Sequence, residues 1–251
     1  MAASYKARCI VLKKTKLGEA DLILTMLSSD GSQIKGVAKG ARKPGNKRFG
    51  ARLEPFSLCD LQLYPGRNLE SITEVRCVES NAACRTDLDR SSACSFMAEL
   101  IAKVIADGEV GERTFSMLAA ALGEIGSNPP GSALLIAVAF AIKATAMMGL
   151  RPAIHVCALC GAPLDEVARF DIEHGGCVCS QCSSSARNDV EPAGVAWIDT
   201  LLGSTFAQLA SVEGAPLLLL LNFADRWIVE HLGIHLKTTS FLRMSLVTPR
   251  A

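Results

Sequence analysis

Four cysteines in two close pairs constrain the fold of this chain more than any other feature of its sequence. Two residues lie between Cys157 and Cys160 and two between Cys179 and Cys182, and eighteen residues separate the pairs. Such short spacing lets both sulfurs of a tight turn face one ion, and two turns complete a tetrahedral thiolate site. The spacing predicts one structural Zn²⁺ site in a loop-rich segment at about 154–185.

Three neighbouring residues leave the ligand set open. Cys177 lies two residues before Cys179 and competes with it or with Cys182, and His155 and His174 are also near enough in sequence to replace a thiolate. Reduced buried cysteines or a redox pair are the other interpretations of the cluster. Because no apolar signal-type stretch follows Met1, we expect a cytoplasmic protein, in which metal is a better explanation than disulfides.

The positive charge is concentrated in the first third of the chain. Residues 1–80 have 14 basic and 8 acidic side chains, whereas residues 81–251 have 12 and 17. Between Gly31 and Leu53 there is no acidic residue. Because cations neutralise phosphates, we predict a nucleic-acid site made of Lys35, Lys39, Arg42, Lys43, Lys47, Arg48, Phe49 and Arg52. The alternative is an exposed cationic loop without function.

Few aromatic residues accompany this basic run. Phe49, Phe56 and Tyr64 are the candidates for stacking on bases. Phe49 lies inside the basic run, so we expect it to stack, while Phe56 is expected in the core.

The first 80 residues have the pattern of short strands. Apolar or alternating segments run over 7–12, 21–27, 33–38, 53–64 and 69–78, with Gly, Pro and Ser between them. Five short strands separated by turn signals predict a small closed barrel.

From about residue 87 the apolar residues recur at helical spacing. The stretch 133–148 is apolar almost all round and predicts a central buried helix that begins after Ser132. Helices are also expected over 193–212 and 215–232, and 236–251 is expected to be weakly ordered. The fold class predicted is α+β, with domains at 1–80 and 81–251 and the zinc knuckle inserted in the second.

Motifs for catalysis are absent from the sequence. No phosphate-binding loop, dinucleotide motif, zinc-protease motif or nucleophile elbow is found, so we expect neither an enzyme nor a small-molecule substrate. Glu19 and Asp21 are interpreted as a surface pair, and His231 and His235 as unsuited to a metal because Gly233 lies between them. The longest uncharged apolar run has ten residues, too short to span a membrane.

Several motifs together resemble the bacterial RecO family of recombination mediators. Gly18-Glu-Ala-Asp21-Leu-Ile-Leu-Thr is similar to an early family segment, and Val37-Ala-Lys-Gly-Ala-Arg-Lys43 to the family's basic loop. Arg48-Phe-Gly50 followed by Leu53-Glu-Pro-Phe56, and the cysteine pairs with Gly175-Gly176, also match in order. Cys177 is an extra cysteine, and Lys47 stands where the family often has serine.

The resemblance implies an N-terminal OB-fold, a helical domain and a four-cysteine zinc site. It also implies binding of single- and double-stranded DNA, annealing of complementary strands, and loading of RecA on strands covered by single-strand-binding protein (SSB). The implied partners are RecR and the acidic tail of SSB, and the resemblance carries DNA contact over to Lys39, Arg42 and Lys43.

Two rival interpretations stay open on the sequence alone. A zinc-ribbon protein acting on RNA or in transcription would share the basic barrel but would not anneal strands. A zinc-dependent enzyme would need an open metal position, which four thiolates do not leave. Lys143, Arg151 and Arg226 beside apolar helices are interpreted as ordinary charged helix positions rather than as the rim of a peptide groove.

Overall fold

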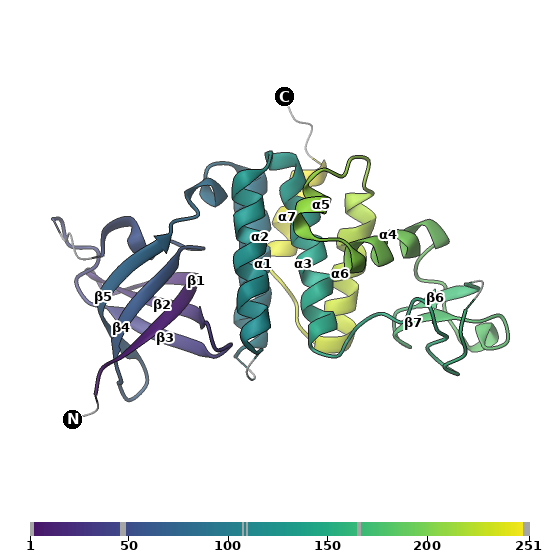
Figure 1. Cartoon of the computed structure of the whole chain (residues 1–251), viewed down its shortest axis with the longest axis horizontal. Coiled ribbons are helices and arrows are strands. Elements are labelled where there is room, and N and C mark those ends of the chain that lie inside the picture. The colour runs from purple at the N-terminus through teal and green to yellow at the C-terminus, as the bar shows by residue number, and fades with distance from the viewer. Residues whose placement is uncertain (1–2, 46–48, 107, 109, 165–166, 248–251) are drawn as a thin grey trace. The chain divides into compact units, whose positions relative to one another are not determined.

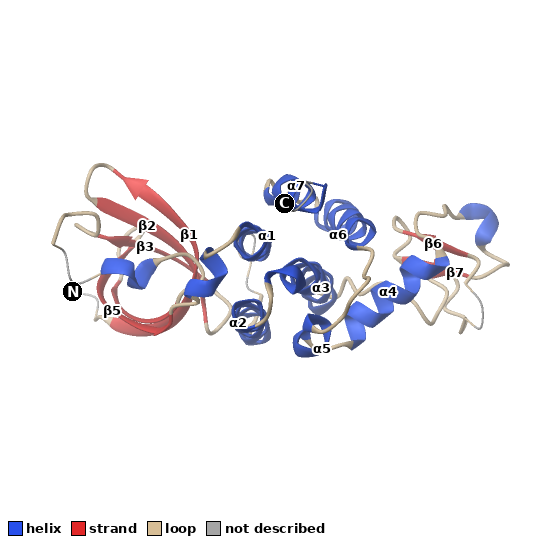
Figure 2. Ribbon diagram, turned by 90° about the horizontal axis from the view of Figure 1, so that it is seen from above, coloured by secondary structure: helices blue, strands red, loops and turns tan. Residues whose placement is uncertain are grey.

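A closed barrel forms the beginning of the chain in the computed structural model, which describes residues 3–45, 49–106, 108, 110–164 and 167–247. Its strands are β1 (Tyr5–Leu17), β2 (Asp21–Ser28), β3 (Gln33–Ala38), β4 (Leu58–Tyr64) and β5 (Glu70–Glu79). They close in the order β1-β2-β3-β5-β4 (Figures 1 and 2). This confirms the predicted barrel, which is OB-like.

β1 is long enough to pair with two neighbours. Tyr5–Ile10 pair with β4, and Cys9–Leu17 pair with β2. A register shift between Val11 and Lys13 marks a bulge, which bends the strand so that it serves both partners. The predicted strand over 7–12 was therefore too short, and the extension adds three lysines to the barrel.

The parallel pairing of β3 with β5 closes the barrel, and it depends on Gly36. Gly36 pairs with Glu70. A Cβ on Gly36 would lie 2.9 Å from Cγ1 and 3.0 Å from Cδ1 of Ile72, closer than ordinary contact. A side chain at this position would therefore push Ile72 out of its place in the barrel core.

The chain forms two compact units, residues 1–130 and residues 131–251. Two helices complete the first unit. Short 3₁₀ turns at Gly50–Leu53 and Ala82–Arg85 precede α1 (Leu88–Val104) and α2 (Glu112–Ser127). Asp87 begins α1, because its carboxylate accepts the backbone N–H of Arg90 at 2.9 Å. α1 packs against β1 and β2. The last barrel strand, β5, ends at Glu79, whereas the two compact units divide after Pro130 and not at the predicted boundary after residue 80.

The second unit is built around α3 (Ala133–Met147), which follows a 3₁₀ turn at Pro130–Ser132. Twelve of its residues are buried, and it contacts α4 (Pro192–Gly203), α5 (Phe206–Ala210) and α6 (Leu217–Leu232). The predicted central helix is confirmed. Among the described residues, one stretch, Pro130–Met147, is long and apolar enough to cross a membrane. Of this stretch, 72% is buried, as is usual for a core helix.

Two predictions about the C-terminal helices were wrong. The helix expected over 193–212 is divided into α4 and α5, because Thr205 starts a new helix through reciprocal hydrogen bonds with Gln208. The tail 236–251 was expected to be weakly ordered, but its described part forms α7 (Thr238–Val247), while 248–251 lie outside the described residues. Its Leu242 is buried, and Thr239 donates a hydrogen bond to Asp225 at 3.1 Å.

Candidate nucleic-acid interface and metal centre

Four residues of the predicted nucleic-acid site are exposed cations on one edge of the barrel. Lys35 is exposed in β3, and Lys39, Arg42 and Lys43 are exposed in the turns that follow this strand. We call the segment Lys39–Lys43 the cationic loop. Arg52 is exposed in the 3₁₀ turn at Gly50–Leu53. Lys47 and Arg48 lie outside the described residues.

One further lysine extends this edge and was missed by the sequence analysis. Lys13 pairs with Thr25 across β1 and β2, and Thr25 pairs with Lys35 across β2 and β3. Directly paired residues share one face of a sheet, so Lys13, Thr25 and Lys35 form a row on the barrel exterior. The run of lysines at 13–16 was visible in the sequence, but the predicted strand ended before it.

The prediction that Phe49 stacks on bases is not supported by its position. Phe49 is 1% exposed and belongs to the barrel core together with Leu53 and Leu61. Burial in the barrel core removes the apolar ring from water, which lowers the free energy more than exposure beside basic side chains would. Phe56 is buried, as expected, whereas Tyr64 is 47% exposed and stays available for stacking.

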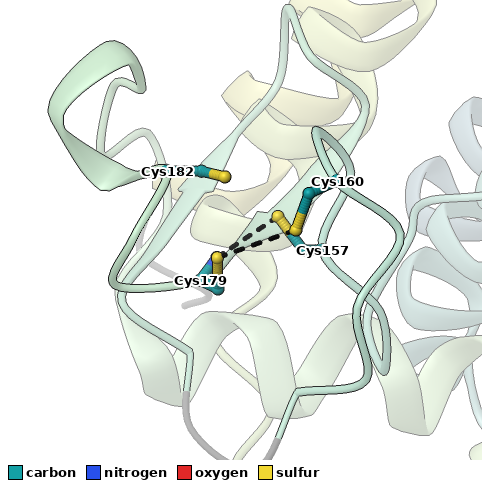
Figure 3. A group of neighbouring side chains, drawn as sticks. All are labelled: Cys157, Cys160, Cys179 and Cys182. Carbon is teal, nitrogen blue, oxygen red and sulfur yellow. Dashed lines mark hydrogen bonds between the residues drawn. The ribbon is translucent and has the colours of Figure 1, made fainter.

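The two cysteine pairs come together in a small lobe of the second unit. The lobe holds β6 (Arg169–Asp171), β7 (Gly176–Val178) and a 3₁₀ turn at Ser183–Ser185. The four sulfurs, one from each of the predicted ligands, lie within 4.8 Å of one another, and Figure 3 shows them facing a common centre. A tetrahedron of thiolates around zinc has S–S edges of about 3.8 Å, because each Zn–S bond is about 2.3 Å. The Cys160–Cys179 sulfur distance is 3.9 Å.

The surroundings of the sulfurs favour a bound cation. The backbone N–H groups of Cys179 and Cys160 point at Cys157 and lower its pKa to about 6. Hydrogen bonding to the Cys179 sulfur, together with burial and the other thiols, raises the pKa of Cys182 to about 12. Four negative thiolates within this distance repel one another, so all four ionise together only around a metal ion. The donor set therefore fits a thiophilic metal such as zinc.

The three competing ligands are engaged elsewhere. Cys177 is fully buried in β7, and this burial raises its pKa to about 11. His155 pairs with Asp199 at 3.3 Å, and His174 pairs with Asp171 at 2.9 Å. In the part of the chain that the structure describes, the metal group contains none of them.

Two carboxylates organise the lobe and attach it to α6. Buried Asp171 accepts the backbone N–H groups of Arg187 and His174 at 2.7 and 3.1 Å. Asp189 accepts the N–H of Ile172 at 3.0 Å and pairs with Arg226 of α6 at 2.7 Å. Phe170 packs edge-on against Phe223 of the same helix. The four-cysteine cluster is thus held beside α6.

We predict that Gly176→Ala disturbs the lobe far more than the same change at Gly203. A Cβ at Gly176 would lie 2.2 Å from the carbonyl oxygen of Ala153, whereas one at Gly203 meets nothing within 4 Å. The first variant should lose about 2–4 kcal/mol of stability in urea unfolding, because backbone must move, and the second should lose almost none. Equal losses of stability in the two variants would show that the contact between Gly176 and Ala153 is not tight.

The other charged candidates have ordinary structural roles. The ammonium of Lys143 donates to the carbonyl of Leu202 at 2.9 Å, and burial lowers its pKa. Arg226 is occupied by Asp189. α6 ends at Leu232 before Gly233, so His231 and His235 do not share a helix face. Lys143 and Arg226 therefore agree with the interpretation as ordinary charged helix positions, while Arg151 is exposed after the end of α3.

Taken together, these features define a class of protein in which a cationic OB-like barrel precedes helices and an inserted cluster of four cysteines that could hold a metal. Comparison with known proteins identifies the family. Residues 1–81 match the family model "Recombination protein O N terminal", and residues 85–240 match "Recombination protein O C terminal". The chain belongs to the RecO family of DNA repair proteins, which supports a role in recombinational repair.

Curated relatives agree along most of the chain. A "DNA repair protein RecO" of Rubrobacter xylanophilus is 36% identical over 216 residues, covering 84% of this chain and 86% of the relative. The protein of the same name from Desulforamulus reducens is 32% identical, covering 95% and 93%. That of a Nocardioides species is also 32% identical, covering 95% and 98%.

Proposed function

We propose that the chain is a recombination mediator that binds single- and double-stranded DNA, anneals complementary strands and helps to load RecA on SSB-coated DNA. The observation that carries this proposal is the cationic edge of the barrel. The row of Lys13 and Lys35 continues into exposed Lys39, Arg42 and Lys43, and no acidic residue lies between Gly31 and Leu53. Such a surface attracts the phosphate backbone of any sequence.

Annealing follows from this mode of binding. Because Phe49 is in the core, the cationic loop contacts phosphates and leaves the base edges free to pair with a second strand. Two strands approach each other only when their negative charge is neutralised, and the barrel edge supplies that charge. No covalent bond changes, so we propose that the protein is not an enzyme.

Zinc is proposed as the metal, with a structural role. Cys157, Cys160, Cys179 and Cys182 would hold it, and four protein thiolates leave no coordination position for a substrate. The ion would hold together two turns that are separated by eighteen residues in the sequence. Residues 1–80 and 81–251 are proposed as the two sequence domains, with the knuckle in the second.

The proposed partners follow from membership of the family. They are DNA, RecR and the acidic C-terminal tail of SSB, with no small-molecule substrate and no membrane. A protein that works on DNA in recombination would lie in the cytoplasm, associated with the nucleoid.

The proposal predicts binding and annealing that fall steeply with salt. We assume that Lys13, Lys35, Lys39, Arg42 and Lys43 each contact one phosphate. The plot of log Kd against log salt concentration then has a slope of about 3.5, because each single-strand contact contributes about 0.7. Affinity for a 30-nucleotide strand should then fall about a hundredfold between 50 and 200 mM salt. Fluorescence anisotropy measures the slope, and mixing of labelled complementary strands measures annealing. Binding without annealing would favour the alternative of a zinc-ribbon RNA or transcription protein.

A further inference from the structure

Three hydrogen bonds join the β1–β2 turn and Asp21, the first residue of β2, to the cationic loop. The Asp21 carboxylate accepts the backbone N–H of Gly40 at 2.7 Å. The carbonyl of Ala20 accepts the backbone N–H of Arg42 at 2.8 Å, and the carbonyl of Gly18 accepts Nη1 of the Arg42 guanidinium at 3.1 Å. A side chain and two carbonyls of one turn therefore hold both ends of Gly40–Arg42.

The register of the barrel brings these segments together. Leu22 in β2 pairs with Ala38 in β3, the final pair of that ladder. Asp21 therefore lies opposite the point at which the chain leaves β3. Beyond it, the Lys43 N–H donates to the carbonyl of Gly40 at 3.0 Å and closes the turn. Fixing Gly40 thus fixes the turn that carries three exposed cations.

The charge of Asp21 makes its position informative. A carboxylate beside a phosphate-binding loop repels DNA, so Coulomb attraction alone favours its removal. Glu19 is an exposed acid of the same turn. Asp21 differs from it because it is half-buried and accepts a hydrogen bond from the loop.

We propose that Asp21 is a positioning residue, which holds the cationic loop in the conformation that presents Lys39, Arg42 and Lys43 to DNA phosphates. This inference rests on the proposed DNA-binding function. Arg42 donates one of its five guanidinium N–H groups to Gly18, so up to four are left for a phosphate. A pre-formed loop binds more tightly because fewer side chains must be ordered on binding.

Three variants of the full chain separate hydrogen bonding from charge. Asp21→Ala removes both the acceptor and the charge. Asp21→Asn removes the charge and keeps an acceptor oxygen. Glu19→Gln removes one negative charge from the same turn and leaves the Gly40 contact in place. Each is measured for binding to a 30-nucleotide oligo-dT by fluorescence anisotropy over a series of salt concentrations.

The positioning role predicts different effects on DNA affinity for Asp21→Ala and Asp21→Asn, although both substitutions remove the same negative charge. Asp21→Ala should bind oligo-dT about fivefold more weakly, since the Gly40 N–H loses its acceptor oxygen. Asp21→Asn and Glu19→Gln should bind as tightly as the unmodified chain, or up to about twofold more tightly. Hydrogen exchange of the Gly40 amide should be about tenfold faster in Asp21→Ala alone, which reports the contact directly.

Binding of the unmodified chain to oligo-dT distinguishes failure of the proposed function from failure of the positioning role. If it does not bind oligo-dT in a salt-dependent manner, the proposed function fails before the variants matter. If it binds, and Asp21→Ala binds equally well or more tightly, the positioning role is wrong. Asp21→Asn weakened as much as Asp21→Ala would also contradict it, because the acceptor would then have no effect.

Discussion

Removal of the metal is expected to unfold the four-cysteine lobe and to lower the thermal stability of the chain. In the described residues of the lobe, the regular structure is two strands of three residues each and one short 3₁₀ turn. Its own apolar cluster is small, made of Cys157, Val178 and Ala186. Such a cluster cannot offset the entropy of ordering some thirty residues, and metal binding contributes on the order of 10 kcal/mol of folding free energy in comparable sites.

Cys160→Ser is the variant that tests this most directly. Cys160 is exposed, so its replacement removes a ligand with little loss of packing. We expect less than one metal ion per chain by elemental analysis, faster proteolysis within 154–185 and a lower melting temperature. A strong chelator should give the same result with the unmodified chain.

Cys177→Ala provides the matched control. Cys177 is in the same lobe, is more deeply buried than Cys160, and lies outside the metal group. It should retain one metal ion and lose only about 1 kcal/mol, the usual effect of a small cavity. Loss of metal from Cys177→Ala, with retention in Cys160→Ser, would reverse the assignment of ligands. Four protected thiols with zinc in elemental analysis would identify the ion.

Local patterns allowed the architecture and the four-cysteine cluster to be predicted from the sequence. Alternation over 33–38 and the apolar stretch at 133–148 correspond to β3 and α3, because each pattern reports burial on one element. The cysteine pairs were informative for a similar reason. Ligand spacing within a turn is fixed by chain geometry and needs no knowledge of the rest of the fold.

The errors concern contacts between segments far apart in sequence. Phe49 stands among cations, and only the closure of the barrel shows that its ring points inward. The strand that carries Lys13 continues because β2 pairs with it, although its lysines are poor strand formers. Asp21 was interpreted as a surface acid, since its partner Gly40 is nineteen residues away and reachable only through the β2–β3 register.

The second large effect is expected in DNA binding when the cationic loop is neutralised. Lys39, Arg42 and Lys43 are changed together to Ala. At about 100 mM salt, the loss of three phosphate contacts should weaken single-strand binding about a hundredfold and lower the salt slope by about 2. Annealing of SSB-coated complementary strands should fall in parallel, because it requires the same neutralisation.

A second triple variant carries the same change in net charge at other sites. Arg113, Arg151 and Lys237 are exposed and lie outside the barrel strands. Their replacement by Ala should leave the salt slope within about 0.5 of its original value, since these side chains belong neither to β1 or β3 nor to the cationic loop. Equal losses in both variants would mean that net charge, and not the barrel edge, determines binding.

Comparison of binding and annealing in the loop variant identifies the step that the cations serve. If binding and annealing fall together, the loop holds the strand that is to be paired. If binding persists while annealing is lost, Lys13 and Lys35 hold the first strand and the loop receives the second, because two polyanions need two separate sets of cations. A variant that binds and anneals normally would place the DNA site elsewhere on the chain and would overturn the role proposed for the barrel edge.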